Sequence, residues 1–66
     1  MQYEITSKLN AEGVIEYGIK ASDNSISIQN ISTNKHSIEV LTDKFNSNNL
    51  SKEHLSEAID DFINSL

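Results

Sequence analysis

Apolar residues fill every second position through most of the segment from Tyr3 to Ile31, and this alternation constrains the fold more than any other feature of the chain. A period of two, carried by β-branched and aromatic residues, is typical of strands that bury one face. The segment 10–13, Asn-Ala-Glu-Gly, interrupts the alternation and suits a type I turn that closes with a bulge at its glycine. Segments 2–9 and 14–21 are therefore predicted to form an antiparallel hairpin.

The turn also predicts which residues face each other across this hairpin. If Asn10 faces Val14, the apolar positions of both strands share one face, with Val14 as the exception. The pairs expected on that face are Leu9 with Ile15, Ile5 with Ile19, and Tyr3 with Ala21. The pairs expected on the other face carry opposite charges: Lys8 with Glu16, and Glu4 with Lys20. A slip of one residue would send the apolar set to both faces, so the hydrophobic pattern specifies this register.

A second turn predicts a third strand. Asp23 and Asn24 both tolerate positive φ, so a type I′ turn is expected there, followed by a strand at 26–31. The facing pairs expected are Ala21 with Ile26, Ile19 with Ile28, and Tyr17 with Asn30. The three segments together form an antiparallel meander with 14–21 as its central strand.

After Ile31 the apolar residues no longer recur at every second position but at spacings of three and four residues, which indicates a helix. Ser32, Thr33 and Asn34 are good N-cap residues, and behind them Ile38, Leu41 and Phe45 form an apolar stripe. Val40 lies off that stripe, so a fourth strand beginning at residue 38 is the alternative for 38–41. The helical spacing favours the helix.

A second helix is predicted to follow the Asn-Ser-Asn-Asn break at 46–49. Ser51 is its expected N-cap, with Leu50 and Leu55 as a hydrophobic staple around it. Its expected apolar face comprises Leu55, Ala58, Ile59, Phe62, Ile63 and Leu66. Such a helix needs a surface to cover, and the apolar side of the sheet provides one. The predicted fold is α+β: a three-stranded antiparallel β-meander with two C-terminal helices packed on one face, in the order β-β-β-α-α.

Length and composition narrow the classes of function. The 66 residues make a single domain, 1–66, with ten acidic and five basic residues and a net charge of −5. This acidity and the absence of arginine disfavour direct binding of nucleic acid. Without cysteine there are no disulfides and no thiolate metal sites. Apolar runs are no longer than two residues, so no membrane span or signal peptide is predicted, and we expect a complete cytoplasmic protein.

Catalytic chemistry finds little support in the sequence. The two imidazoles, His36 and His54, lie 18 residues apart, and the sequence contains no His-Glu-x-x-His motif, no phosphate loop and no nucleophile elbow. We therefore expect no catalytic residues, no metal site and no cofactor. Both histidines are interpreted as exposed polar residues.

Two features are candidate partner-binding sites. Glu53, Glu57 and Asp60 fall on one line of the second predicted helix, with Asp61 at its flank. This acidic stripe is either a solvated outer face or a docking surface for a basic partner. Gly18 lies in the middle of the central strand, on the face expected to be wet, where a glycine weakens a sheet. It indicates either a bulge or strong local twist, or a place where a partner chain or an aromatic side chain packs against bare backbone.

The outer sheet face and the strand edges bear on self-association. Val14 and Ile31 are expected as isolated apolar residues on the same outer face as Gly18. A meander also leaves one free edge on each outer strand. Both features favour a homodimer.

Several short motifs resemble a known bacterial family. They are Tyr17-Gly18-Ile19, Ile31-Ser32-Thr33, Leu50-Ser51 with His54-Leu55, and Asp61-Phe62. Together they are similar to a domain of unknown function found in short proteins of spore-forming anaerobes, over residues 17–63. This resemblance implies no activity.

Two hypotheses for function fit a small acidic chain without an evident active site. The first is a non-enzymatic protein-binding module that acts as a regulator or adaptor. The second is an acidic inhibitor, of the kind a phage would carry, that blocks the basic nucleic-acid groove of a host enzyme by charge mimicry. Mimicry requires carboxylates along a continuous surface, whereas Lys8 and Lys20 partly neutralise those on the sheet.

Overall fold

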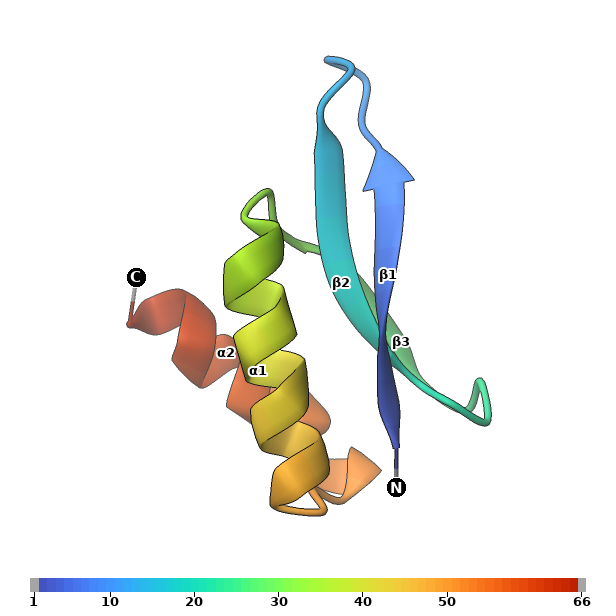
Figure 1. The fold of residues 1–66 in the computed structure, drawn as a ribbon, viewed down its shortest axis with the longest axis vertical. Helices are drawn as coiled ribbons and strands as arrows, with labels where there is room; N and C mark the ends of the chain where they lie inside the picture. The colour runs from blue at the N-terminus through green and yellow to red at the C-terminus, as the bar shows by residue number, and fades with distance from the viewer. Residues whose placement is uncertain (1, 66) are drawn as a thin grey trace.

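The structure, a computed structural model, describes residues 2–65. Three strands are followed by two α-helices with a single 3₁₀ turn between them: β1 Tyr3–Leu9, β2 Ile15–Ala21, β3 Ser27–Ser32, α1 Lys35–Ser47, η1 Lys52–His54 and α2 Leu55–Asn64. The strands form one antiparallel sheet in the order β1-β2-β3, and both helices lie on the same side of it (Figure 1). This arrangement confirms the predicted β-β-β-α-α architecture.

The β1–β2 hairpin has the predicted register along its whole length, from Tyr3 opposite Ala21 to Leu9 opposite Ile15. The turn also has the predicted form. The Gly13 N–H donates to the Asn10 carbonyl at 3.0 Å, and Gly13 has a φ of 80°. The turn chemistry and the alternation therefore specify the same pairing.

The β2–β3 pairing matches the prediction only in part. Ile19 faces Ile28 as expected, but Tyr17 faces Ser32 rather than Asn30, because the register shifts between these pairs. Asn30 has a φ of 59° within this irregularity, a conformation that asparagine tolerates. The irregularity interrupts the regular alternation of side chains along β3. Ile31 is buried in the core, so its predicted place on the outer face was wrong.

The turn between β2 and β3 also differs from the prediction. Asn24 has a φ of 64°, but Asp23 does not have positive φ, so this is not a type I′ turn. Instead the Asp23 carboxylate accepts the N–H of Ser25 at 3.0 Å, while the Asn24 N–H donates to the Ala21 carbonyl. The Asp23 side chain thus satisfies a backbone donor within the loop.

Helix α1 begins where the N-cap cluster predicted. The Asn34 side chain caps it by accepting the Ser37 N–H at 3.2 Å. Its stripe of Ile38, Leu41 and Phe45 is buried, and Val40 points to solvent with 54% of its surface exposed. Residues 38–41 are therefore helical, and the alternative of a fourth strand is wrong.

The second helix starts later than predicted. Ser51 accepts the N–H of Glu53, but the residues that it caps form the 3₁₀ turn η1, and α2 begins at Leu55. Within α2, Leu55 and Ile59 are buried, whereas Ile63 is 44% exposed. Leu66, predicted for the same apolar face, lies outside the described residues.

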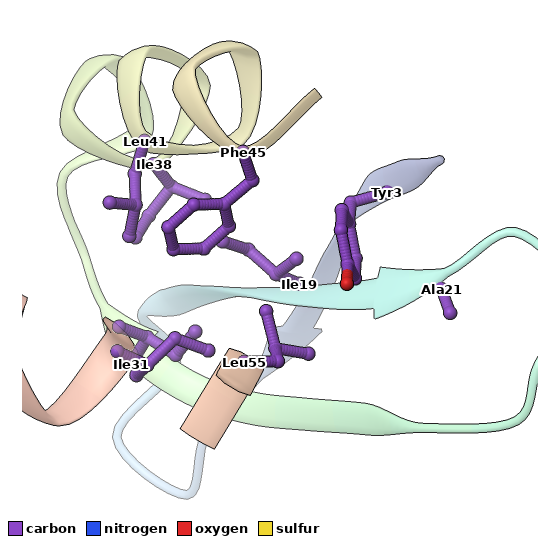
Figure 2. Packing of buried hydrophobic residues seen from close by; sticks show 9 residues of the cluster. Tyr3, Ile19, Ala21, Ile31, Ile38, Leu41, Phe45 and Leu55 are labelled. Carbon is purple, nitrogen blue, oxygen red and sulfur yellow. The ribbon is translucent and has the colours of Figure 1, made fainter. Parts of the chain in front are cut away.

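The core lies between the helices and the sheet (Figure 2). Its buried apolar residues come from all three strands and both α-helices: Tyr3, Ile19, Ala21, Ile31, Ile38, Leu41, Phe45, Leu55 and Ile59. The Tyr3 ring meets Phe45 edge-on at 6.0 Å, and its hydroxyl donates to the Leu50 carbonyl at 2.7 Å. Tyr3 therefore holds the start of β1 against the end of α1.

The far end of the β1–β2 hairpin extends past the helices (Figure 1). Leu9 and Ile15 lie on the face that becomes the core nearer the helices, yet they are 64% and 47% exposed. The alternation correctly predicts their shared face. It does not predict how far along the hairpin the helices reach.

Candidate functional site: a groove between the helices

A groove of about 390 Å³ lies between α1 and α2. Its apolar lining comes from both helices and from the segment that joins them: Leu41, Phe45, Leu50, Ala58 and Phe62. Its polar lining consists of Lys44, Asn48, Asp61 and Ser65. An apolar interior with a few polar groups is the usual composition of a protein's binding sites.

The groove exists because the two helices rest on different parts of the sheet. Helix α1 contacts all three strands, whereas α2 contacts β3. The buried side chains of Leu41 and Phe45 border the groove on the α1 side. On the α2 side, Ala58 and Phe62 are only partly buried, and the small Ala58 side chain fills little of the space.

Charged groups occur on both helices that form the groove. Lys44 comes from the last turn of α1, where a cation is favourable, and Asp61 comes from α2. Both side chains belong to exposed residues. The groove can therefore accept an apolar side chain and offer a partner one cation and one carboxylate.

The predicted acidic stripe is divided in the structure. Glu53, Glu57, Asp60 and Asp61 are all exposed, but only Asp61 lines the groove. Glu53 lies in η1 rather than in α2, so the single α-helical line that was expected does not include it. The Glu57 carboxylate lies 3.4 Å from Nδ1 of His54, and both side chains are largely exposed. Such an exposed pair contributes little to stability.

Gly18, the other predicted partner site, is buried rather than open to solvent. A Cβ placed on it would collide with the Ile28 carbonyl and would lie 2.7 Å from the Gln29 Cα. The glycine therefore lets the irregular part of β3 approach the central strand. Its bare backbone is covered by this chain's own neighbouring strand, which is the bulge interpretation of the sequence rather than a partner surface.

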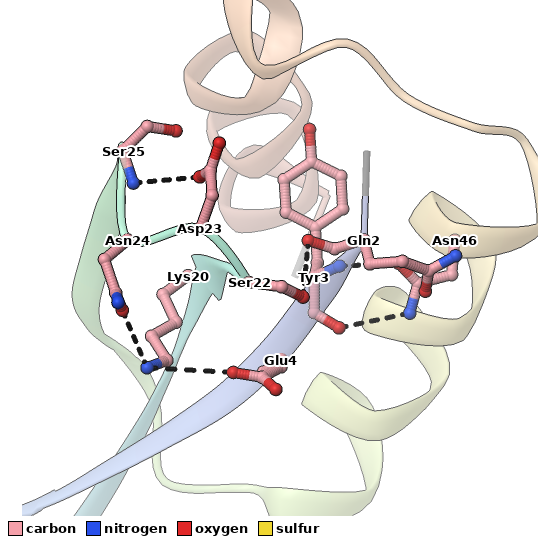
Figure 3. Close-up of polar contacts among 9 residues, drawn as sticks. All are labelled: Gln2, Tyr3, Glu4, Lys20, Ser22, Asp23, Asn24, Ser25 and Asn46. Carbon is pink, nitrogen blue, oxygen red and sulfur yellow. Dashed lines mark hydrogen bonds and ion pairs between the residues drawn. The ribbon is translucent and has the colours of Figure 1, made fainter.

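Two titratable groups have shifted pKa values, Tyr3 and Asp23, and neither lines the groove. Burial raises the pKa of Tyr3, and the negative charge of Asp23 adds to that effect. Hydrogen bonds from Ser25 lower the pKa of Asp23. Figure 3 shows both residues in one view with the Glu4–Lys20 ion pair, which spans 3.7 Å. No group of three or more metal-ligating side chains occurs within residues 2–65.

Sequence reasoning missed the groove because its residues fit ordinary core stripes. The spacing of Leu41 and Phe45, and that of Ala58 and Phe62, predicts a face turned toward the sheet. Neither stripe predicts the distance between the two helices. The only local signal is the small side chain of Ala58 within the α2 stripe.

Among residues 2–65, no helix has the length and apolar character needed to cross a membrane.

The family model of a family of unknown function (DUF6514) matches residues 1–65, and the chain belongs to that family. This confirms the expectation of a domain-of-unknown-function family and extends the match beyond the 17–63 range of the short motifs. No curated protein and no solved structure matches the chain.

Proposed function

We propose that this member of the DUF6514 family is a small non-enzymatic protein-binding module that acts as a regulator or adaptor. The observation that carries this proposal is the open, mostly apolar groove between α1 and α2. A partner would place an apolar side chain between Phe45 and Phe62. Buried apolar and aromatic contacts of this kind dominate the affinity of protein interfaces.

The charges around the groove indicate the character of the partner segment. Asp61 lies in the groove, and Glu57 and Asp60 occupy other exposed positions of α2. We therefore expect a basic residue next to the partner's apolar anchor, within reach of Asp61. Exposed charges of this kind steer the encounter more than they hold the complex, so salt should slow association.

The alternative function, an acidic inhibitor that mimics nucleic acid, has weaker support. It draws on the exposed carboxylates of α2, which has no basic residue in its last turn. A mimic needs a continuous line of negative charge, however, and Lys20 pairs with Glu4 on the outer face of the sheet. The groove favours recognition of an apolar anchor over recognition of charge alone.

The proposal can be tested by blocking the groove without disturbing the fold. Ala58→Glu places a longer, charged side chain in the groove and keeps a residue with good helix propensity. Val40→Glu adds the same charge on the exposed side of α1 and serves as the matched control. Partners would be captured from cells of the source organism by a photo-crosslinking residue at Asn48, then purified.

The expected result is that the purified partner binds the wild type and Val40→Glu equally and loses most of its affinity for Ala58→Glu. Thermal unfolding of both variants checks that each remains folded. A partner that binds all three proteins equally would refute a role for the groove. A partner that instead loses binding to a Glu53→Gln, Glu57→Gln, Asp60→Gln triple variant would favour recognition through charge, as the inhibitor hypothesis requires.

A further inference from the structure

The outer edge of β1 carries a specific set of unpaired backbone groups. In an antiparallel pair, alternate residues direct their N–H and C=O groups toward the neighbouring strand and away from it. The N–H of Asn10 donates to Val14 and the Gln2 carbonyl accepts from Ser22, so the even-numbered residues bond to the β2 side. The uninterrupted β1–β2 register extends this rule along the strand. The odd-numbered residues therefore face the free edge.

The backbone N–H and C=O groups of the first odd-numbered residue, Tyr3, are already hydrogen-bonded to a side chain of α1. The Tyr3 N–H donates to Oδ1 of Asn46 at 2.8 Å, and Nδ2 of Asn46 donates to the Tyr3 carbonyl at 3.2 Å (Figure 3). One side-chain amide thus supplies the donor and the acceptor that a paired strand would have supplied. This closes the edge at Tyr3 and excludes it from pairing with another strand.

Three residues remain open on this edge: Ile5, Ser7 and Leu9. Within residues 2–65, no other group bonds to their outward N–H and C=O groups. Leu9 is also 64% exposed, more than any other large hydrophobic residue that the structure describes. An open run of backbone groups with an exposed apolar side chain is suited to pairing with another strand.

We propose that this edge pairs with the same edge of a second copy of the chain, with the two β1 strands antiparallel and centred on Ser7. In this register the three open residues meet the three open residues of the second copy. Ser7 faces its counterpart, and Ile5 of each copy faces Leu9 of the other. Both apolar pairs lie on the helix side of the joined sheet, where they cover the exposed Leu9 side chain.

The Asn46 cap distinguishes this register from its nearest competitor. Pairing centred on Thr6 would place Tyr3 opposite Leu9 of the second copy, and it would need the two Tyr3 backbone groups that Asn46 occupies. Pairing centred on Ser7 leaves both Asn46 bonds intact. It also places Lys8 opposite Thr6, so no like charges meet directly across the strands.

The other edge of the sheet is less suited to such pairing. Strand β3 contains the register shift between Tyr17 and Ile19 of its neighbour, and α2 packs against it. Irregular pairing of this kind is a common protection of edge strands. The inference is independent of the proposed function, because no residue of β1 lines the groove.

Cysteine crosslinking tests both the dimer and its register, since the chain has no cysteine of its own. Residues that face each other in a hydrogen-bonded pair have Cα atoms about 5.5 Å apart, a separation that a disulfide can span. Under mild oxidation Ser7→Cys should form a covalent dimer almost completely. Thr6→Cys reports the competing register, and Ser27→Cys on β3 reports random collision; both should react far less.

Sedimentation of the full chain over a range of concentrations completes the test. We expect the wild type to reach twice the chain mass, and added salt to favour the dimer because each copy carries a net charge of −5. Ser7→Pro removes only an outward N–H, so it should remain folded by circular dichroism and lose the dimer. A wild type that is monomeric at every concentration, or faster crosslinking of Thr6→Cys or Ser27→Cys, would overturn the proposal. A folded Ser7→Pro that still dimerises would also overturn it.

Discussion

Replacing Gly18 with alanine should destabilise the protein, because the added methyl group has no room. Its position lies 2.7 Å from the Gln29 Cα, 2.8 Å from Oγ1 of Thr6, and closer still to the Ile28 carbonyl. The Thr6 side chain can rotate away. The other two neighbours belong to the β3 backbone, so they can move only if the irregular β2–β3 pairing shifts.

The size of the effect follows from two opposing contributions. Overpacking of a close-packed region costs about 1–3 kcal/mol. Restriction of the unfolded chain by alanine returns about 0.4–1 kcal/mol. Because two of the three neighbours are backbone atoms, we expect the free energy of unfolding to fall by about 1–2 kcal/mol net. For a domain of this size that lowers the melting temperature by about 4–16 °C.

Urea denaturation followed by far-UV circular dichroism would measure this change. Gly13→Asn is the matched control, since Gly13 has no neighbour within 4 Å and asparagine tolerates its φ of 80°. Adding Thr6→Ala to Gly18→Ala should restore only a small part of the stability. If Gly18→Ala were as stable as the wild type, or if adding Thr6→Ala restored the full stability, the β3 backbone would not be the reason that glycine is needed at this position.

Three further predictions concern the core and the helix ends. Tyr3→Phe should lower the free energy of unfolding by about 0.5–1.5 kcal/mol at neutral pH, because the bond to the Leu50 carbonyl is lost. Burial raises the pKa of Tyr3 above 10.0 in the folded state, so wild-type stability should fall as the pH rises above that value. Urea titrations at increasing pH should show a smaller fall in Tyr3→Phe. Asn34→Ala should lower the free energy of unfolding by about 0.5–2 kcal/mol, because the α1 cap is lost, and Asn34→Asp should lower it much less. Chemical denaturation would measure both changes. Leu55→Ala, at a fully buried site, should cost about 2–5 kcal/mol in the same assay, and a loss below 1 kcal/mol would contradict its place in the core.

The predictable part of the fold rests on neighbouring residues. The β1–β2 register follows from the alternation together with the turn at Asn10 and Gly13, which are local in sequence and agree with each other. The start of α1 follows in the same way from Asn34 and the stripe behind it. In both places a single short segment contains all of the information required.

Ile31 shows where this kind of reasoning fails. Its predicted face came from counting positions along a regular strand, and this count no longer holds where the strand is irregular. Asn30 tolerates positive φ and Gly18 permits the close approach of β3, so both contributing residues are visible in the sequence. Their joint effect is not visible, because it depends on how closely β3 lies against β2.

The groove was unpredictable for a related reason, and it shows how a chain this small can retain a binding surface. The stripes of α1 and α2 each predict burial against the sheet, and the deepest residues of both, Ile38 and Leu55, are fully buried as expected. The sheet is only three strands wide, and α1 contacts all of them, which leaves α2 the β3 side. The flanks of both stripes, represented by Phe45 and Phe62, are then left bordering a space that the core does not fill. The width of the sheet relative to the two helices, rather than any motif, therefore produces the candidate site.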